Sequence, residues 1–309
     1  MILVTGATGF LGGRVCKKLS ERGLAYEATS LSLGTDLRDV QATHELFGRV
    51  KPQQVIHCAA YVGGIQFGMQ NPVGLFNDNL KMTLNLYEAA QAADVGRIVN
   101  PISNCAYPAR ATLFKEDEFW DGPLHESVMV YGFVRKASWV GAWAYAKQFG
   151  LDVINLVLSN MYGPGDHFDE ERSHALGALI MKFVEAKESG AASVSVWGTG
   201  APVREWLHVD DGAEALIRGL AVSPCLEPLN IGVGKGASIL EIAELVKQEV
   251  GYQGAIELDT SKPDGAPYKT VDGSRARAHF AWTPQIDFVE GVRQTIRWYA
   301  EHRRDASAG

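Results

Sequence analysis

The chain has 309 residues, of which 46% are hydrophobic and 21% are charged, a balance typical of a folded globular protein. Its net charge of −7, without a run of Lys and Arg, argues against a nucleic-acid partner. No apolar stretch approaches the roughly 18 residues of a membrane span. The four cysteines are scattered without CxxC spacing, so we expect no metal site, no disulfide framework and a reducing, cytoplasmic location.

Strand and helix signals alternate in the first half of the chain. Short apolar runs predict strands, and longer runs of helical periodicity predict the helices between them. The expected elements are strands at 2–4, 26–30, 54–60, 97–100 and 152–157, with helices after the first strand and at 73–93 and 131–150. This alternation predicts an α/β fold with a doubly wound parallel (Rossmann) sheet and right-handed crossovers.

The alternation loosens from Asn160 onward, where Gly163-Pro-Gly-Asp166 interrupts it. The stretch 204–211 predicts a strand that returns to the sheet, with an Asp capping the helix that follows. We therefore expect a dinucleotide-binding domain over residues 1–160, to which the chain returns at about 203–222. A smaller, interleaved α/β substrate-binding lobe is expected over residues 161–309.

A glycine-rich turn follows the first predicted strand. Gly6, Gly9 and Gly12 have the spacing of a dinucleotide site, in which the helix N-terminus binds the pyrophosphate. A glycine turn without a ligand is the alternative, and the strand–turn–helix context favours the cofactor. Residues 28–31 offer no carboxylate to bind the ribose diol of NAD, so NADP is expected. Asp36 is a candidate adenine contact or simply part of a surface turn.

Ser103 and Tyr131 together indicate redox chemistry at a carbonyl or carbinol carbon. Ser103 stands at the end of a predicted strand, where ligands bind in parallel sheets, and both hydroxyls can hold an oxygen next to the reacting carbon. Tyr131 alone could be an ordinary core or surface aromatic. A phenol that acts as an acid at neutral pH needs a cation close by. Arg135 lies one helical turn later, whereas Lys136 points around the helix.

Cys105 and His174 suggest a second reaction. A thiol and an imidazole beside a ketone can remove and return protons on carbon, as in an epimerisation. The simpler alternatives are a small buried hydrophobic residue for Cys105 and a loop or cap histidine for His174.

These motifs make the chain resemble the extended short-chain dehydrogenase/reductases and, within them, the GDP-L-fucose synthases, across nearly its whole length. The matching stretches are Thr5-Gly-Ala-Thr-Gly-Phe-Leu-Gly12, Ala59-Ala-Tyr-Val-Gly-Gly-Ile65, Ser103-Asn-Cys-Ala-Tyr-Pro108, Asn160-Met-Tyr-Gly-Pro164, Ser173-His174, Val196-Trp-Gly198, Arg204-Glu-Trp-Leu-His-Val-Asp-Asp211 and Lys262-Pro-Asp-Gly265. The stretches at 62–65 and 262–265 are the most specific, because the whole superfamily shares the glycine turn.

The resemblance implies an NADPH-dependent enzyme that epimerises C3 and C5 of a GDP-linked 4-keto-6-deoxymannose and then reduces C4. Ser103 and Tyr131 would polarise and protonate the C4 oxygen, with Arg135 as their cation. Cys105 and His174 would be the base and acid of epimerisation. The implied cofactor contacts are Gly6, Thr8, Gly9, Phe10, Leu11, Gly12, Asp36, Leu37, Ala59, Ala60, Arg135 and His174. The implied substrate contacts are Asn160, Lys182, Trp197, Arg204 and Lys262. Superfamily members also pair the helices at 73–93 and 131–150 into a dimer, so a homodimer is expected.

Three positions depart from the family pattern. The family's Tyr-xxx-Lys is Tyr131-xxx-Arg135 here, its Thr-Pro-Arg-Lys is Ala266-Pro-Tyr-Lys269, and Lys182 stands where the family has an Arg. The last two concern the nucleotide and are compatible with a different base or a different sugar, such as a heptose. A reductase or an epimerase alone, on a related sugar nucleotide, is the alternative within this class. A dinucleotide-binding protein without turnover is the alternative from another class.

Overall fold

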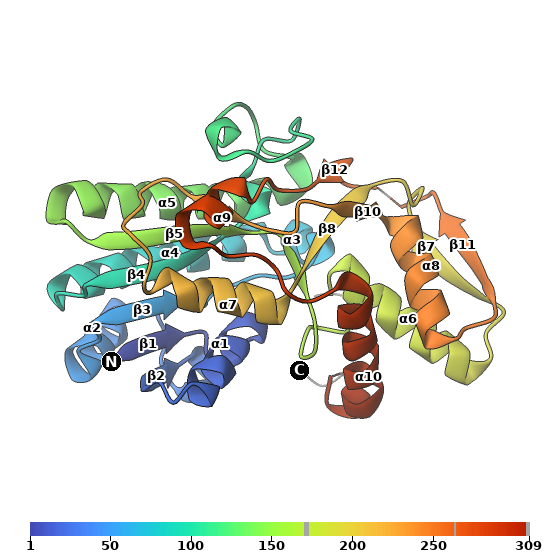
Figure 1. Cartoon of the computed structure of the whole chain (residues 1–309), viewed down its shortest axis with the longest axis horizontal. Coiled ribbons are helices and arrows are strands. Elements are labelled where there is room, and N and C mark those ends of the chain that lie inside the picture. Colours follow the sequence, from blue (N-terminus) through green and yellow to red (C-terminus); the bar gives the residue numbers. More distant parts are fainter. Residues whose placement is uncertain (170–172, 263, 307–309) are drawn as a thin grey trace.

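A computed structural model describes residues 1–169, 173–262 and 264–306. At its centre lies a parallel sheet with the strand order β2-β1-β3-β4-β5-β9 (Figure 1). Its strands are β1 (Ile2–Thr5), β2 (Tyr26–Thr29), β3 (Gln54–His57), β4 (Arg97–Ser103), β5 (Asp152–Leu158) and β9 (Leu229–Ile231). The predicted doubly wound α/β fold is confirmed.

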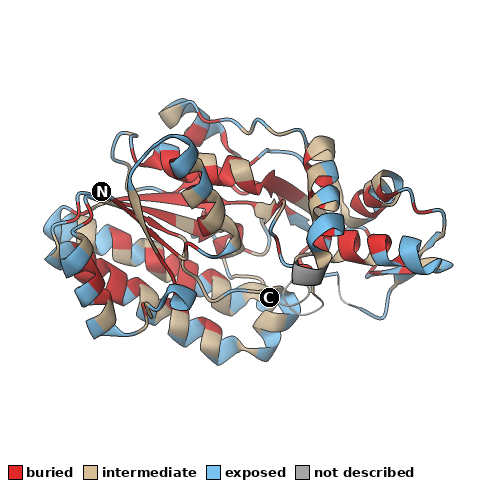
Figure 2. Cartoon of the chain, turned by 90° about the horizontal axis from the view of Figure 1, so that it is seen from below, coloured by how far each residue is buried: buried red, intermediate tan, exposed pale blue. Residues whose placement is uncertain are grey.

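Helices cover both faces of this sheet because alternate strand residues point to opposite sides. Ile2 and Val4 pack in one cluster, with residues of α1 (Phe10–Glu21) and α7 (Val209–Gly219). Leu3 packs on the other face, in a cluster with residues of α2 (Val40–Val50), α4 (Pro72–Ala92) and α5 (Met129–Phe149). Buried residues accordingly concentrate along the strands and on the helix faces that meet them (Figure 2).

A second sheet with the strand order β10-β8-β12 stands beside the main one, and β6 pairs with its strand β8. Its strands are β6 (Asn160–Tyr162), β8 (Val203–His208), β10 (Gly236–Ser238) and β12 (Tyr268–Lys269). The prediction that the strand at 204–211 returns to the main sheet is therefore wrong. The chain returns to the main domain only after β8, where α7 packs against α1 and β9 pairs with β5.

The cap of α7 also differs from the prediction. His208, rather than an Asp, is the N-cap residue, and its Nδ1 accepts a hydrogen bond from the Asp210 amide at 3.2 Å. The Asp211 carboxylate instead accepts from the amides of Gln285 and Ile286, both at 3.0 Å. It thereby ties α7 to the segment that leads into the last helix.

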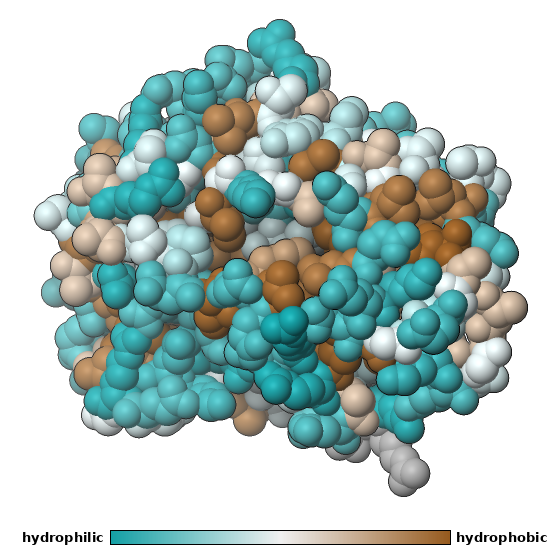
Figure 3. Space-filling view, turned by 45° about the vertical axis from the view of Figure 1, so that its right-hand side comes forward, coloured by the Kyte–Doolittle hydropathy of each residue, from teal (hydrophilic) through white to brown (hydrophobic). Residues whose placement is uncertain are grey.

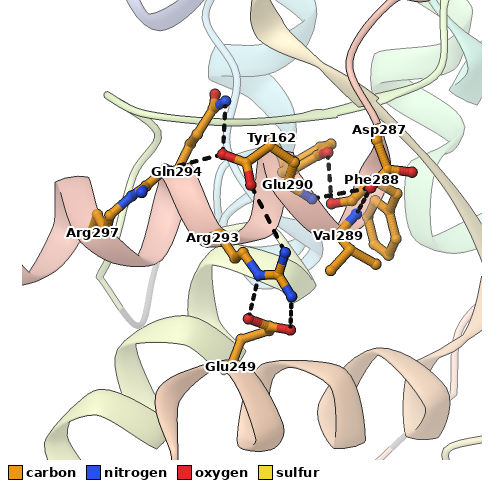
Figure 4. A network of polar contacts seen from close by, with 9 residues as sticks. All are labelled: Tyr162, Glu249, Asp287, Phe288, Val289, Glu290, Arg293, Gln294 and Arg297. Atoms are coloured by element: carbon orange, nitrogen blue, oxygen red, sulfur yellow. Dashed lines mark hydrogen bonds and ion pairs between the residues drawn. The ribbon is translucent and has the colours of Figure 1, made fainter.

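The outer lobe has its own core. Residues of β7 (Ser193–Trp197), α6 (Ala175–Ser189), α8 (Ile239–Val250) and α10 (Phe288–Ala306) build it, and β11 (Ala255–Asp259) pairs with β7. Figure 4 shows an ion pair that links α10 to α8: Arg293 donates to both oxygens of Glu249, at 2.7 and 3.0 Å.

The remaining elements are α3 (Ile65–Gln70), α9 (Ser274–Phe280) and short 3-10 helices η1 (Leu31–Leu33), η2 (Asn104–Ala106), η3 (Glu116–Glu118) and η4 (Glu126–Val128).

Within the described residues, no helix has the length and apolar character needed to cross a membrane. The same residues contain no group of three or more His, Cys, Asp or Glu side chains arranged to hold a metal ion.

Candidate active site

The glycine turn brings β1, β3 and α1 into close contact. Gly6 has φ +64°, and a Cβ there would lie 2.6 Å from the amide nitrogen of Ala59. A Cβ on Gly12 would lie 2.1 Å from the Gly6 carbonyl oxygen, so only glycine lets α1 begin this close to the turn. The N-cap residue Gly9 has no side chain to cap the helix, and the first turn has no acid. These features fit a dinucleotide pyrophosphate.

The loop after β2 contains the predicted adenine contacts. Asp36 receives hydrogen bonds at 2.8 Å from both Nε and Nη2 of Arg38, and these bonds lower the pKa of Asp36. Leu37 is only 4% exposed, and its side chain packs in the sheet core. Thr8, Phe10 and Leu11 lie in the glycine turn and the first turn of α1, as predicted.

Ser103 and Cys105 lie at the carboxyl end of β4. Ser103 caps η2, and its Oγ accepts a hydrogen bond from the Cys105 amide at 3.2 Å. Lys269 approaches from β12, and its Nζ donates to the Cys105 Sγ at 3.6 Å. Lys269 is only 8% exposed and pairs in register with Arg204 on β8. The Lys269 ammonium thus places a positive charge beside the Cys105 sulfur.

Tyr131 and Arg135 lie on the first turns of α5. The guanidinium carbon of Arg135 is 5.0 Å from the centre of the Tyr131 ring, and Nη2 lies 3.5 Å from Asn79 Oδ1. Among the described residues, its buried Nε–H has no hydrogen-bond partner. Asn79 also bonds to the backbone of Tyr61, at 3.1 and 2.9 Å, and so links Arg135 to the loop after Ala59-Ala60. A buried guanidinium with an unpaired donor fits the ribose hydroxyls of a nicotinamide nucleotide.

Lys136 occupies a different environment. Its Nζ lies 4.7 Å from the centre of the Phe119 ring and 4.4 Å from that of Trp120, and it donates to the Phe119 carbonyl. The cation beside Tyr131 is therefore Arg135.

His174 is the N-cap residue of α6. Burial, together with the nearby charges of His167 and Lys269, lowers the pKa of His174 to about 4. Its ring is therefore neutral at pH 7 in the free protein. Burial also lowers the pKa of Arg204, against the opposing influence of Cys105 and Asp264. Lys269, His174, Cys105 and Arg204 thus lie close enough for their charges to interact.

The predicted substrate contacts fall into two groups. Asn160 and Arg204 lie on β6 and β8 of the second sheet, where the Asn160 Nδ2 donates to the Glu205 carbonyl at 3.1 Å. In the outer lobe the Nζ atoms of Lys182 and Lys262 lie 5.5 and 5.3 Å from the centre of the Trp197 ring. The face of the molecule turned to view in Figure 3 has apolar residues across its middle, between hydrophilic regions.

Two family motifs that are distant in sequence meet at Arg204. A Cβ on Gly265 would lie 3.5 Å from the Arg204 Nη2 and 3.6 Å from the Ile65 Cδ1. Ile65 and Gly265, one from each motif, thus approach the same side of the site.

Comparison with known proteins agrees with this geometry. The NAD dependent epimerase/dehydratase family matches residues 2–232. The chain belongs to this family. It is 37% identical over 303 residues to the probable GDP-L-fucose synthase 1 of Oryza sativa subsp. japonica, covering 97% of this chain and 92% of that protein. It is 32% identical to the GDP-L-fucose synthase of Escherichia coli, covering 98% and 97% of the two chains. The predicted resemblance is confirmed.

Solved structures give the same result. A GDP-6-OMe-4-keto-L-xylo-heptose reductase from C. jejuni superimposes with a TM-score of 0.91 at 26% identity, covering 97% of each chain. A GDP-L-fucose synthetase from Naegleria fowleri bound to NADP gives a TM-score of 0.88 at 28% identity, covering 98% of this chain and 93% of that one.

The sequence analysis missed Lys269, Asn79 and Gly132. A Cβ on Gly132 would lie 2.3 Å from the Cys105 carbonyl oxygen, so this glycine lets α5 approach the cysteine turn. Lys269 ends the stretch 266–269, which differs from the family's Thr-Pro-Arg-Lys at two positions but keeps its final Lys. That retained Lys could have indicated a site residue. Asn79 and Gly132 are single residues within long helices and had no local signal.

Proposed function

We propose that this chain epimerises a GDP-linked 4-keto-deoxysugar and reduces its C4 carbonyl with NADPH, in the manner of GDP-L-fucose synthases. The observation that carries the proposal is the convergence of two reactive sets at one end of the sheet. Tyr131 and Arg135 serve reduction, and Cys105 with Lys269 serves proton transfer on carbon. A dinucleotide-binding protein without turnover has no need for the second set.

In the reduction, bound NADPH would supply the hydride that C4 gains. Tyr131 gives its phenolic proton to the C4 oxygen, which gains the electron pair of the broken C=O π bond. The Ser103 hydroxyl holds the same oxygen, and the Arg135 guanidinium beside the phenol stabilises the phenolate that remains. The free Nε–H of Arg135 holds a ribose hydroxyl and so orients the nicotinamide.

In the epimerisation, the Cys105 thiolate takes the proton from the carbon next to the carbonyl. The C–H electron pair moves to the carbonyl oxygen as an enolate, and an S–H bond forms. Lys269 fixes the position of the sulfur and supplies positive charge beside it. A proton returned to the opposite face of the carbon completes the inversion. A neutral His174 must gain a proton before it can serve as this acid, and the negative charge of a bound nucleotide sugar favours that protonation.

A reductase without epimerisation is the second candidate, because the C. jejuni heptose reductase shares the fold so closely. The Lys182 and Tyr268 departures concern the nucleotide and sugar rather than the reaction. The contact between Lys269 and Cys105 favours the two-step reaction.

Isotope exchange tests the proposal. The wild type is incubated in deuterium oxide with GDP-4-keto-6-deoxymannose and NADP+, without NADPH, so that only proton transfer on carbon occurs. Cys105→Ser and His174→Gln should slow deuterium entry at C3 and C5 by on the order of 100-fold. Cys225→Ser and His44→Gln, which alter a thiol and an exposed imidazole elsewhere, serve as controls. If Cys105→Ser and His174→Gln incorporate deuterium at the wild-type rate, these two residues are misassigned. NADPH consumption without any exchange would favour the reductase.

We also propose that the chain forms a homodimer through α4 and α5 and acts in the cytoplasm. Both helices carry exposed apolar side chains, and the four cysteines are all free thiols. Free thiols are typical of a reducing compartment.

A further inference from the structure

The carboxyl end of β2 distinguishes the two nicotinamide cofactors in this fold, because it lies beside the adenosine ribose. Ser30 follows β2 directly here and caps η1, with only 7% of its surface exposed. Thr8 reaches the same place from the glycine turn, and Ser32 reaches it from η1.

The hydroxyl groups of these residues form a closed triangle. The Thr8 Oγ1 lies 3.0 Å from the Ser30 Oγ and 2.8 Å from the Ser32 Oγ, and the two serine oxygens are 3.0 Å apart. The Ser30 Oγ also accepts a hydrogen bond from the Leu33 amide at 3.2 Å, which leaves its proton available to another acceptor. Each hydroxyl has one proton, which can rotate toward a ligand while the oxygen atom keeps its position.

We infer that this hydroxyl triangle (Thr8, Ser30 and Ser32) binds the 2′-phosphate of NADPH and selects NADPH over NADH. A phosphate monoester presents three acceptor oxygens, and hydrogen bonds to such charged groups are stronger than those between neutral groups. Three neighbouring hydroxyls at the ribose position match that set. The inference rests on the proposed function only for the identity of the cofactor.

Arg38 is the cation in this loop that would ordinarily be assigned to the phosphate. Its guanidinium is held by Asp36 at 2.8 Å and by Asp78 at 2.9 Å, and these bonds raise the pKa of Arg38. A guanidinium held by two carboxylates has little net charge to offer a third anion. The hydroxyl triangle therefore carries the selectivity.

The three hydroxyls differ in how much of the local structure depends on them. Ser30 is buried and caps η1, so its removal also disturbs the loop. Thr8 belongs to the turn that approaches the pyrophosphate. Ser32 is exposed and its hydroxyl bonds to the other two members, which makes it the most informative position to change.

Binding of adenosine phosphates tests the inference without any sugar chemistry. Calorimetry compares 2′,5′-ADP with 5′-AMP, and NADP+ with NAD+, for the wild type and for Ser32→Ala, Ser32→Thr and Ser32→Asp. The matched control is Ser20→Ala, because Ser20 is an exposed serine whose hydroxyl bonds to Tyr26 on β2 at 2.9 Å.

The wild type should prefer 2′,5′-ADP, and Ser32→Ala should reduce that preference by about tenfold, as the loss of a hydrogen bond to a charged group implies. Ser32→Thr should retain the preference and Ser32→Asp should reverse it. The inference is overturned if both Ser32→Ala and Ser32→Asp keep the wild-type ratio, or if Arg38→Met alone abolishes it. If the wild type showed the predicted affinity ratios but neither epimerised nor reduced the sugar nucleotide, the proposed function would be contradicted. The inference about the hydroxyl triangle would still hold.

Discussion

Arg135 and Lys136 are adjacent cations that α5 directs to different sides. Arg135 is 4% exposed and lies over Tyr131, and Lys136 is 6% exposed and lies against Phe119 and Trp120. Burial lowers the pKa of Lys136, whereas cation–π contacts and its bond to the Phe119 carbonyl hold the ammonium in place. The helix therefore places one cation beside Tyr131 and packs the other against the loop at 116–120.

Substitutions should separate these two roles. We expect Arg135→Met to lower kcat/KM for the reduction by on the order of 100-fold, because the phenol loses its cation and the cofactor loses a donor. Arg135→Lys should keep most of the activity with an altered pH profile. Lys136→Met should leave kcat/KM within about threefold and lower Tm, since its removal weakens contacts with two aromatic rings. Steady-state kinetics give kcat/KM and thermal melting gives Tm for each variant. A large loss of activity in Lys136→Met would show that Lys136, and not Arg135, is the catalytic cation.

At the same scale, the sequence predicted residues that lie within motifs and missed residues that act across the fold. Ser103, Cys105 and Arg135 were predicted because each stands at a strand end or at helical spacing from a reactive group. Lys269 meets Cys105 only through the pairing of β12 with β8, which no local pattern specifies. Leu37, which the family resemblance implies as a cofactor contact, packs its side chain in the sheet core.

At the scale of elements, periodicity predicted the strands and helices well and failed on their assignment to sheets. Strand β8 has the apolar pattern of a buried strand, and that pattern fits the second sheet as well as it fits the main sheet. The pairing partners Asn160, Ala237 and Lys269 lie far from it in sequence and decide where it belongs. Similarly, His208 could cap α7 because its ring nitrogen accepts an amide hydrogen bond, a role usually filled by Ser, Thr, Asp or Asn.

Gly132 controls the approach of α5 to the cysteine turn. In Gly132→Ala the new methyl group would meet the Cys105 carbonyl, so the helix or the turn must move. Because Tyr131 and Cys105 lie on the two segments that separate, we expect both reduction and isotope exchange to fall by at least about tenfold, consistent with the sensitivity of catalysis to small displacements. The control is Gly48→Ala on α2, where a Cβ would meet nothing within 4 Å. Equal activity in the two variants would mean that the close approach is not needed.

At the scale of the whole molecule, the chain combines a cofactor domain with a lobe that brings Trp197, Lys182 and Lys262 together. The reactive residues come from both parts, since Ser103 and Tyr131 belong to the main domain and Lys269 and Arg204 to the second sheet. Segments of the two parts alternate along the sequence.

The surface of α4 and α5 leads to the last prediction. These helices pack side by side, and Phe76 of α4 stacks on Phe133 of α5 with ring centres 6.2 Å apart. Both rings remain exposed, at 42% and 50%, and Val140 and Trp143 continue the apolar surface along α5, each 44% exposed. We expect an apolar surface of this kind to be covered in an interface, because leaving it in water forfeits the free energy of burial.

We therefore expect light scattering to give twice the mass of 33.6 kDa for one chain. Trp143→Asp should give the mass of a single chain, because pairing would bury a carboxylate against apolar side chains without a partner. Leu24→Asp is the matched control, since Leu24 is a similarly exposed apolar residue, at 43%, in the turn after α1. Circular dichroism of both variants checks that the fold is kept. A wild-type mass of one chain at working concentration refutes the interface, and a Trp143→Asp dimer places it on another surface.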